Sequence, residues 1–206
     1  MEKTLKQQRS VVLLGTMILL IGFLYYKMQI LTRNNNGAPK DLPTNLTDCI
    51  PTFADGGGPY YKTNAPFRKD IAPKQNNGEK LIVAGKVLKN DCKTPVANAV
   101  LDIWQADELG YYQDEWYRGK IKTNQNGEYT FETVVPKGYG EGTGYRPPHI
   151  HFKIFKDSTE IITSQMFFPE VKDREGFDNA YIMKLETSKQ NGSKLHKDNH
   201  DIILPI

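Results

Sequence analysis

The sequence predicts an all-β domain, an antiparallel β-sandwich, behind a short apolar N-terminal segment. From residue 81 onward, short runs rich in β-branched and aromatic residues recur between clusters of Gly, Asn and Pro. No long stretch has the 3.6-residue periodicity of an amphipathic helix. The 206 residues are enough for one medium domain with its own core plus an appendage.

Each expected strand is one of these runs, bounded by turn residues. The run 90–94 predicts a turn, and Gln125-Asn-Gly127 predicts a hairpin-type turn. The C-terminal Ile202-Ile-Leu-Pro-Ile is compatible with an added edge strand. His196 and His200 lie among Lys, Asp and Asn and are expected to be solvated. The expected strands cover residues 81–88, 97–104, 129–135, 149–155 and 160–168.

The N-terminal segment is unlike the rest of the chain. Residues 10–26 carry no charge and follow a basic flank at residues 1–9. Because no small-residue cleavage site follows, we expect an uncleaved transmembrane helix with its domain on the extracytoplasmic side. A cleaved signal peptide with secretion is the alternative. Residues 27–47 form a polar tether, and residues 48–206 form the domain, beginning with an extended, aperiodic segment wrapped over it.

Charge separates these parts further. The chain has 27 basic and 24 acidic residues, but residues 1–33 hold five of the basic residues and one acid. The rest is almost neutral, so the alkaline pI of about 8.7 comes from the flanks of the apolar segment. This distribution gives no electrostatic reason to expect nucleic-acid binding.

Two cysteines, Cys49 and Cys92, are present, and they do not form a C-x-x-C pattern. A sparse pair in an exported domain is typical of a single disulfide in an oxidising compartment. Two free buried thiols are the alternative.

The most informative stretch is Tyr145-Arg-Pro-Pro-His149-Ile-His151-Phe, which opens an alternating run. Residues two apart on a strand project from the same face, so His149 and His151 lie side by side. Two imidazoles on a rigid ribbon form half of a metal site. Alone, such a pair could equally be two half-buried or surface histidines that bind no metal.

Tyrosines lie on the loops before this strand. Tyr112 follows Trp104-Gln-Ala-Asp-Glu-Leu-Gly-Tyr, and Tyr139 follows Val135-Pro-Lys-Gly. A loop tyrosine is ordinarily a packing residue. As phenolates, however, these two would be hard anionic oxygen donors suited to a trivalent ion.

These residues occur within motifs that follow one another through residues 81–168. The motifs are Gly85-Lys-Val, Pro95-Val, Ile103-Trp-Gln-Ala-Asp, Gly110-x-Tyr, Arg118-Gly, Gly127-x-Tyr-x-Phe-x-Thr, Arg146-Pro-x-His-Ile-His-Phe and Thr163-x-Gln-x-Phe-Phe. Together they resemble the intradiol ring-cleaving dioxygenases of the catechol and protocatechuate type. The region around Cys49 and Gly58-Pro-Tyr-Tyr is similar to the exported branch of that family.

The resemblance implies a non-haem Fe(III) cofactor and a small catechol-type substrate that is cleaved by O2 to a muconate-type diacid. It implies that Arg146 lies over the substrate ring and that Gln165 lies beside the metal ligands. The resemblance implies that Tyr139 is the ligand that leaves the metal and also acts in catalysis. Tyr111, next to Tyr112, is the residue that could be confused with the ligand Tyr112. The implied iron ligands are Tyr112, Tyr139, His149 and His151.

Two other functions compete. One is a membrane-tethered, prealbumin-like β-sandwich that binds ligands without catalytic iron, since the same strands would build it. The other is a zinc or iron(II) site formed by His149, His151 and a carboxylate such as Asp102 or Asp107.

Overall fold

A computed structural model describes residues 49–171 and 182–206, all within one compact unit, Asp48–Ile206. The expected membrane segment at residues 10–26 and its flanks lie outside the described residues. Within the described ranges, no helix is long and apolar enough to cross a membrane. The elements are β1 Lys80–Leu88, β2 Val100–Gln105, β3 Arg118–Lys122, β4 Glu128–Val134, β5 His149–Lys156, β6 Thr159–Phe167, β7 Glu186–Gln190, β8 Ser193–Asn199 and β9 Ile202–Ile203, with single 3-10 turns at Gly142–Gly144 and Pro169–Val171.

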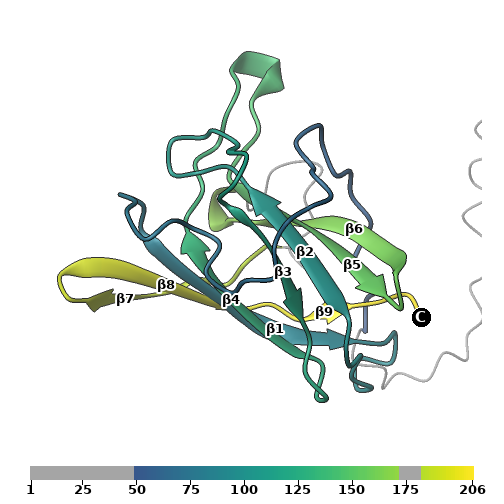
Figure 1. Cartoon of the computed structure of the whole chain (residues 1–206). Helices are drawn as coiled ribbons and strands as arrows, with labels where there is room; N and C mark the ends of the chain where they lie inside the picture. The colour runs from purple at the N-terminus through teal and green to yellow at the C-terminus, as the bar shows by residue number, and fades with distance from the viewer. Residues whose placement is uncertain (1–48, 172–181) are drawn as a thin grey trace, which may run out of the picture. The chain divides into compact units, whose positions relative to one another are not determined.

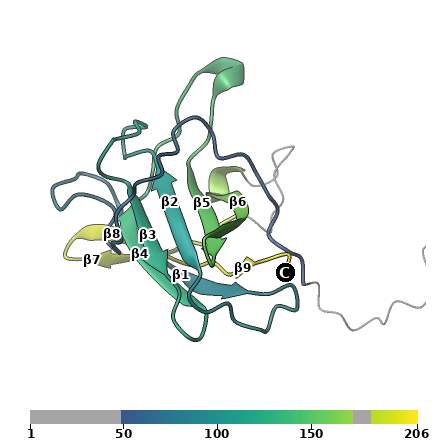
Figure 2. The ribbon, with the colours of Figure 1, turned by 45° about the vertical axis from the view of Figure 1, so that its right-hand side comes forward.

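The strands form two sheets, which Figures 1 and 2 show as two layers. One sheet has the order β4-β1-β8-β7, with β9 also pairing with β1, and the other has the order β3-β2-β5-β6. All pairs of the second sheet are antiparallel. The expected all-β, two-sheet architecture is therefore confirmed. The expectation of purely antiparallel pairing is wrong for β1, which runs parallel to β8 and β9.

The core lies between the two sheets and follows the alternation of each strand. In β5, Ile150, Phe152 and Ile154 are fully buried within it. Successive side chains point to opposite faces, so His149 and His151 must occupy the outer face of the same sheet. The burial of alternate apolar residues therefore fixes where the histidines point.

Three elements differ from the sequence expectation for one reason. β3, β7 and β8 were not expected, because they are short and polar, and every residue of β7 is exposed. β7 forms by backbone pairing to β8 alone, whereas β3 and β8 each bury a single apolar side chain, Ile121 and Leu195, which is too little to give an alternating pattern. The expectation that both tail histidines are solvated is also wrong. His200 is buried beside Asp198, and His196 is partly covered and lies 2.7 Å from Glu79 Oε2.

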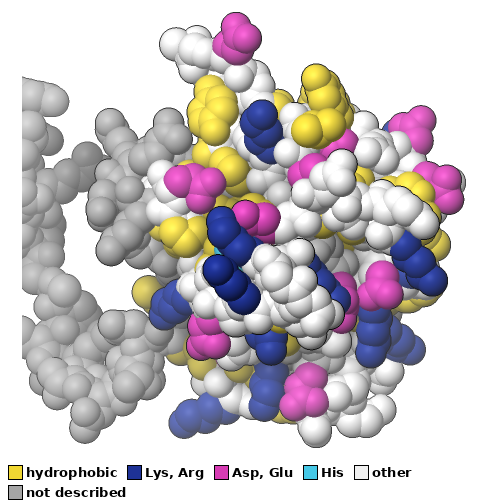
Figure 3. Space-filling view, turned by 90° about the vertical axis from the view of Figure 1, so that its left-hand side faces the viewer, with side chains coloured by type: hydrophobic (Ala, Val, Ile, Leu, Met, Phe, Trp, Pro, Cys, Tyr) yellow, Lys and Arg dark blue, Asp and Glu magenta, His cyan; other side chains and the backbone are white. Residues whose placement is uncertain are grey.

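On the face shown in Figure 3, Lys and Arg side chains alternate with Asp and Glu side chains. Basic side chains there have acidic side chains as neighbours, and this face shows no broad area of a single sign. The mixed pattern agrees with the near-neutral composition of the domain.

A wrapping segment, residues 49–71, runs across the outer face of the second sheet (Figure 2). The Asp55 N–H donates to the Thr163 carbonyl on β6, and Phe67 bridges to Lys120 on β3. Between them, the Tyr61 hydroxyl donates to Asp102 Oδ2 on β2 at 3.0 Å. The expectation of an extended segment over the domain is confirmed, and the segment covers the same face as the histidines.

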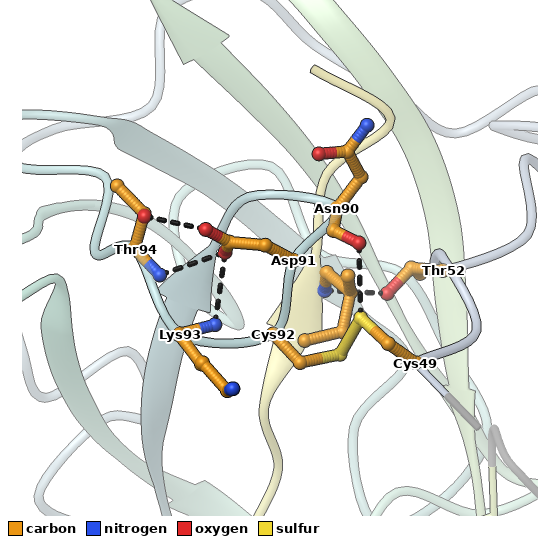
Figure 4. Close-up of a disulfide and its surroundings, with 8 residues drawn as sticks. Cys49, Thr52, Asn90, Asp91, Cys92, Lys93 and Thr94 are labelled. Carbon is orange, nitrogen blue, oxygen red and sulfur yellow. Dashed lines mark hydrogen bonds between the residues drawn. A yellow bond between two sulfur atoms is a disulfide. The ribbon is translucent and has the colours of Figure 1, made fainter. Parts of the chain in front are cut away.

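The wrapping segment is fastened at its start by the Cys49–Cys92 disulfide (Figure 4). Cys92 lies in the turn after β1, which the Asp91 carboxylate organises by accepting hydrogen bonds from the Lys93 and Thr94 N–H groups and the Thr94 hydroxyl. These hydrogen bonds lower the pKa of Asp91 to about 2, and the bond from the Thr94 hydroxyl contributes most. The expected disulfide is therefore present and joins the segment to the opposite sheet.

Replacing both cysteines, Cys49→Ser with Cys92→Ser, is expected to lower the free energy of unfolding. The bridge joins residues 43 apart. In the chain-entropy model, closing such a loop stabilises the fold by about 4 kcal/mol, less any strain. Urea unfolding monitored by tryptophan fluorescence measures the loss, and a reductant should shift the wild-type curve but not that of the double variant. Alkylation of both thiols in the native wild-type protein would contradict the bridge.

Tyr61→Phe is expected to destabilise the domain by about 1 to 2 kcal/mol, because it removes a hydrogen bond from a buried carboxylate. Asp102 is 1% exposed, and the Lys120 ammonium is 3.6 Å away. Burial raises the pKa of Asp102, while the hydrogen bond from Tyr61 and the charge of Lys120 lower it. Tyr111→Phe is the matched control, since Tyr111 is 69% exposed. Equal urea midpoints for the two variants would disprove the role of Tyr61.

Candidate metal centre

The two histidines of β5 face each other on the outer side of the sheet. His149 and His151 are 3% and 2% exposed, and their Nε2 atoms lie 3.0 Å apart. The Nδ1 atom of His149 lies 2.6 Å from the Pro147 carbonyl oxygen, which can only accept a hydrogen bond. Nδ1 therefore carries the proton, and the Nε2 lone pair points toward His151.

Both imidazoles are held in the neutral form. Burial lowers the pKa of His151 to about 2, with a further contribution from the charge of His149. Burial also lowers the pKa of His149, although the Pro147 carbonyl opposes this shift. The neutral imidazole is the form that binds metal ions. His151 Nδ1 is buried without a hydrogen-bond partner among the described residues.

Two tyrosines complete the cluster. The Tyr112 hydroxyl lies 3.2 Å from His149 Nε2. The Tyr139 ring lies 5.6 Å from the Tyr112 ring and 5.8 Å from the His149 ring, measured between centroids. Tyr112 comes from the loop after β2, and Tyr139 from the loop before β5. The structure thus brings together all four residues that the sequence marked as donors.

The electrostatics of this cluster fit a bound cation. Burial raises the pKa of Tyr112 above its ordinary value, and the adjacent Tyr139 raises it further. The phenol is therefore protonated when no cation is present, whereas a trivalent cation would favour the phenolate. Two phenolate oxygens and two neutral imidazoles form a donor set that suits iron(III).

The alternative site with a carboxylate ligand has no third ligand. No cluster of three or more His, Cys, Asp or Glu residues able to hold a metal occurs in residues 49–171 and 182–206. Asp102 is bound to Tyr61 and Lys120. The Asp107 carboxylate accepts hydrogen bonds from the N–H groups of Leu109 and Tyr111. The zinc or iron(II) alternative is therefore not supported.

The sheet holds the histidines in place from the side. His151 on β5 lies directly opposite Trp104 on β2 and Gln165 on β6. Trp104 in turn lies opposite Arg118 on β3. The Trp104 and His151 rings stack with centroids 4.8 Å apart and an interplanar angle of 3°. Since Trp104 is 1% exposed, the imidazole rests on a rigid support.

A pocket of about 360 Å³ lies beside this cluster, and the wrapping segment forms one of its walls. Arg146 lies in the pocket and donates from Nη2 to Gln165 Oε1 at 2.9 Å. Gln165 is 2% exposed. The pocket is lined by Asp55, Gly56, Gly58, Pro59, Tyr60, Tyr139, Arg146, His151 and Gln165.

The sequence assigned no role in the site to the residues of the wall, although three of them belong to the Gly58-Pro-Tyr-Tyr motif. Tyr60 stacks on Tyr112 with centroids 4.2 Å apart and rings 11° from parallel. Gly58 has a φ of +62°, and a Cβ there would lie 3.5 Å from His151 Cε1. A side chain at Gly58 would therefore be strained by its backbone conformation, and its Cβ would lie in van der Waals contact with the imidazole. The glycine run at residues 56–58 and the motif that follows it are the signals in the sequence that mark this wall.

A family model described as a dioxygenase matches residues 57–205. Catechol 1,2-dioxygenase 1 of Acinetobacter lwoffii is 34% identical over 174 residues, which cover 67% of this chain and 54% of that protein. The chain spans about half the length of the curated relatives it matches.

Solved structures share the fold. The 3-chlorocatechol 1,2-dioxygenase of Rhodococcus opacus 1CP superposes with a TM-score of 0.68 at 24% identity, covering 75% of this chain and 72% of that one. The dioxygenase domain of a dioxygenase and carbohydrate-binding protein fusion from Streptomyces sp. SirexAA-E gives a TM-score of 0.62 at 29% identity, covering 76% and 99%. From the match of the family model, the relatives and the fold, this chain belongs to the intradiol ring-cleaving dioxygenase family.

Proposed function

We propose that the domain is a non-haem iron(III) dioxygenase that cleaves a catechol-type ring between its two hydroxylated carbons. Both atoms of O2 enter the product, which is a muconate-type diacid. The observation that carries the proposal is the convergence of two phenols and two neutral imidazoles beside a pocket that contains an arginine. The family relationship supports the reaction class.

In this proposal, iron(III) is held by Tyr112, Tyr139, His149 and His151. When bound, iron(III) would draw electron density from the aromatic ring, which would make a ring carbon reactive toward dioxygen. The phenolates of Tyr112 and Tyr139 would offset two of the three charges of the ion and so lower the cost of burying it. The hydrogen bond from His149 Nδ1 to the Pro147 carbonyl orients one imidazole, and the Trp104 ring supports the other.

The two tyrosines are proposed to differ in role. Tyr112 is packed under the Tyr60 ring and keeps its position. Tyr139 lies between Gly138 and Gly140, in a segment whose backbone pairs with Arg146. We infer that Tyr139 leaves its position when the second substrate oxygen arrives, and that its phenolate then takes the proton of that hydroxyl.

Arg146 supplies positive charge in the pocket. Its guanidinium is held by the buried Gln165 and is proposed to stabilise the electron density that develops on the ring during attack by dioxygen. Because Gln165 holds the guanidinium in the pocket before the reaction, its charge needs little reorganisation as electron density develops on the ring.

We also propose that the domain acts on the extracytoplasmic side of a membrane, attached through residues 10–26. The Cys49–Cys92 disulfide supports an oxidising compartment. Release of a mature form that begins near residue 38 into the soluble fraction would exclude the anchor and favour secretion.

The full chain, purified with iron, is expected to show the visible charge-transfer band of tyrosinate on iron(III) and an equimolar iron content. With catechol and 18O2, mass spectrometry should find both labelled atoms in a ring-opened diacid. A colourless protein that contains zinc would refute the iron site. Binding of catechol without oxygen consumption would favour the binding module instead.

Tyr112→Phe and Tyr139→Phe are expected to behave differently. Tyr112→Phe should lose iron or the charge-transfer colour, because this ligand stays bound throughout turnover. Tyr139→Phe should keep much of the iron, while catechol binding and turnover slow by about 10²-fold or more, because the base for the second proton is gone. Stopped-flow spectra with anaerobic catechol measure both steps. Equal metal retention and equal binding rates in the two variants would contradict separate roles.

A further inference from the structure

We propose that Asp55 is a positioning residue that acts through Gln165 to fix the direction of the Arg146 guanidinium in the pocket. The inference rests on the proposed function, because it assigns a role in catalysis to the charge of Arg146. Asp55 lies on the wrapping segment, 110 residues before Gln165 in the chain.

The three side chains form a continuous line of hydrogen bonds. Gln165 Nε2 donates to Asp55 Oδ2 at 2.7 Å and to the Gly56 carbonyl oxygen at 3.2 Å. On the other side of the same amide, Arg146 Nη2 donates to Gln165 Oε1 at 2.9 Å. A negative charge, a polarised amide and a positive charge are thus aligned in order.

This arrangement allows only one orientation of the Gln165 amide. A carboxylate and a carbonyl can only accept, and a guanidinium can only donate. If the amide were flipped, its NH2 group would face the Arg146 donors and its oxygen would face the Asp55 carboxylate. Asp55 and Arg146 therefore select the same orientation of Gln165 from opposite sides.

The anchored end of the line is Asp55. Its N–H donates to the Thr163 carbonyl at 2.9 Å, and its Oδ1 accepts from the Gly56 N–H at 2.7 Å. Gln165 is 2% exposed on β6 and lies opposite His151. Arg146, in contrast, is exposed and belongs to a loop whose residues 141–145 are exposed as well. The end that is bound to β6 thus orients the exposed guanidinium at the other end.

The consequence concerns the rate of the reaction rather than iron binding. When Asp55 is replaced by Ala, the Gln165 amide keeps only the longer of its two acceptor contacts, the Gly56 carbonyl, and it therefore orients Arg146 less firmly. The ligand cluster keeps its contacts, since Asp55 is not among them. We expect kcat to fall about tenfold, because one charge-assisted contact is no longer preorganised. Iron content and visible colour should stay as in the wild type.

The contact can be tested without turnover, in the metal-free full chain. In 15N-labelled protein, the Gln165 side-chain amide protons should exchange slowly with solvent, and Asp55→Ala should accelerate their exchange. A Gln165→Leu variant assigns the resonances. Asp70→Ala is the matched control, because Asp70 is an exposed acid of the same wrapping segment whose backbone bridges to Glu132 on β4.

The kinetic test is a double-mutant cycle with catechol, normalised to bound iron. Asp55→Ala, Gln165→Leu and the double variant should have similar kcat values, since Asp55 acts only through Gln165. Multiplicative losses in the double variant would overturn the proposal, as would unchanged amide exchange and kcat in Asp55→Ala. Should the iron-loaded wild type fail to turn over catechol, the proposed function fails, and the exchange experiment alone decides whether Asp55 orients Gln165.

Discussion

The alternation of β5 is the constraint on which the site depends. Ile150, Phe152 and Ile154 must enter the core, and this requirement places His149 and His151 on the opposite face. The strand is paired on both edges, to β2 and β6, so it cannot slip by one residue without exposing its apolar side chains. The free energy that fixes two imidazoles 3.0 Å apart therefore comes mainly from packing on the far side of the sheet.

The sequence predicts those parts of the structure whose interactions are between residues close together in the chain. Strands with strong alternation, β1, β2, β4, β5 and β6, are apparent because their signal is local. The four donor residues and Arg146 are identified because the residues next to them in the sequence form motifs typical of the family. The sequence does not predict β3, β7 and β8, and it assigns no role in the site to Asp55 and Tyr60, because their positions come from partners far along the chain. The parallel pairing of β1 with β8 likewise has no local pattern.

The wrapping segment forms the wall that closes the pocket beside the donor residues. The cluster itself needs only β5 and two loops, and it is the stacking of Tyr60 and the close approach of Gly58 that close one side. The segment is fixed to one sheet through Tyr61 and Asp102 and to the turn after β1 through the disulfide. Stability of the fold and definition of the pocket therefore depend on the same contacts of the wrapping segment.

Tyr139 and Arg146 exchange both backbone hydrogen bonds, at 3.0 and 2.8 Å, and so close the base of the loop between them. The tip beyond this pair is open to solvent, and a Cβ at Gly142 or Gly144 would meet no other described residue within 4 Å. The tip can consequently vary in length and composition during evolution while the two functional residues keep their spacing. Substitutions in this tip can therefore accumulate as the family adapts to different ring substituents, without displacing Tyr139 or Arg146.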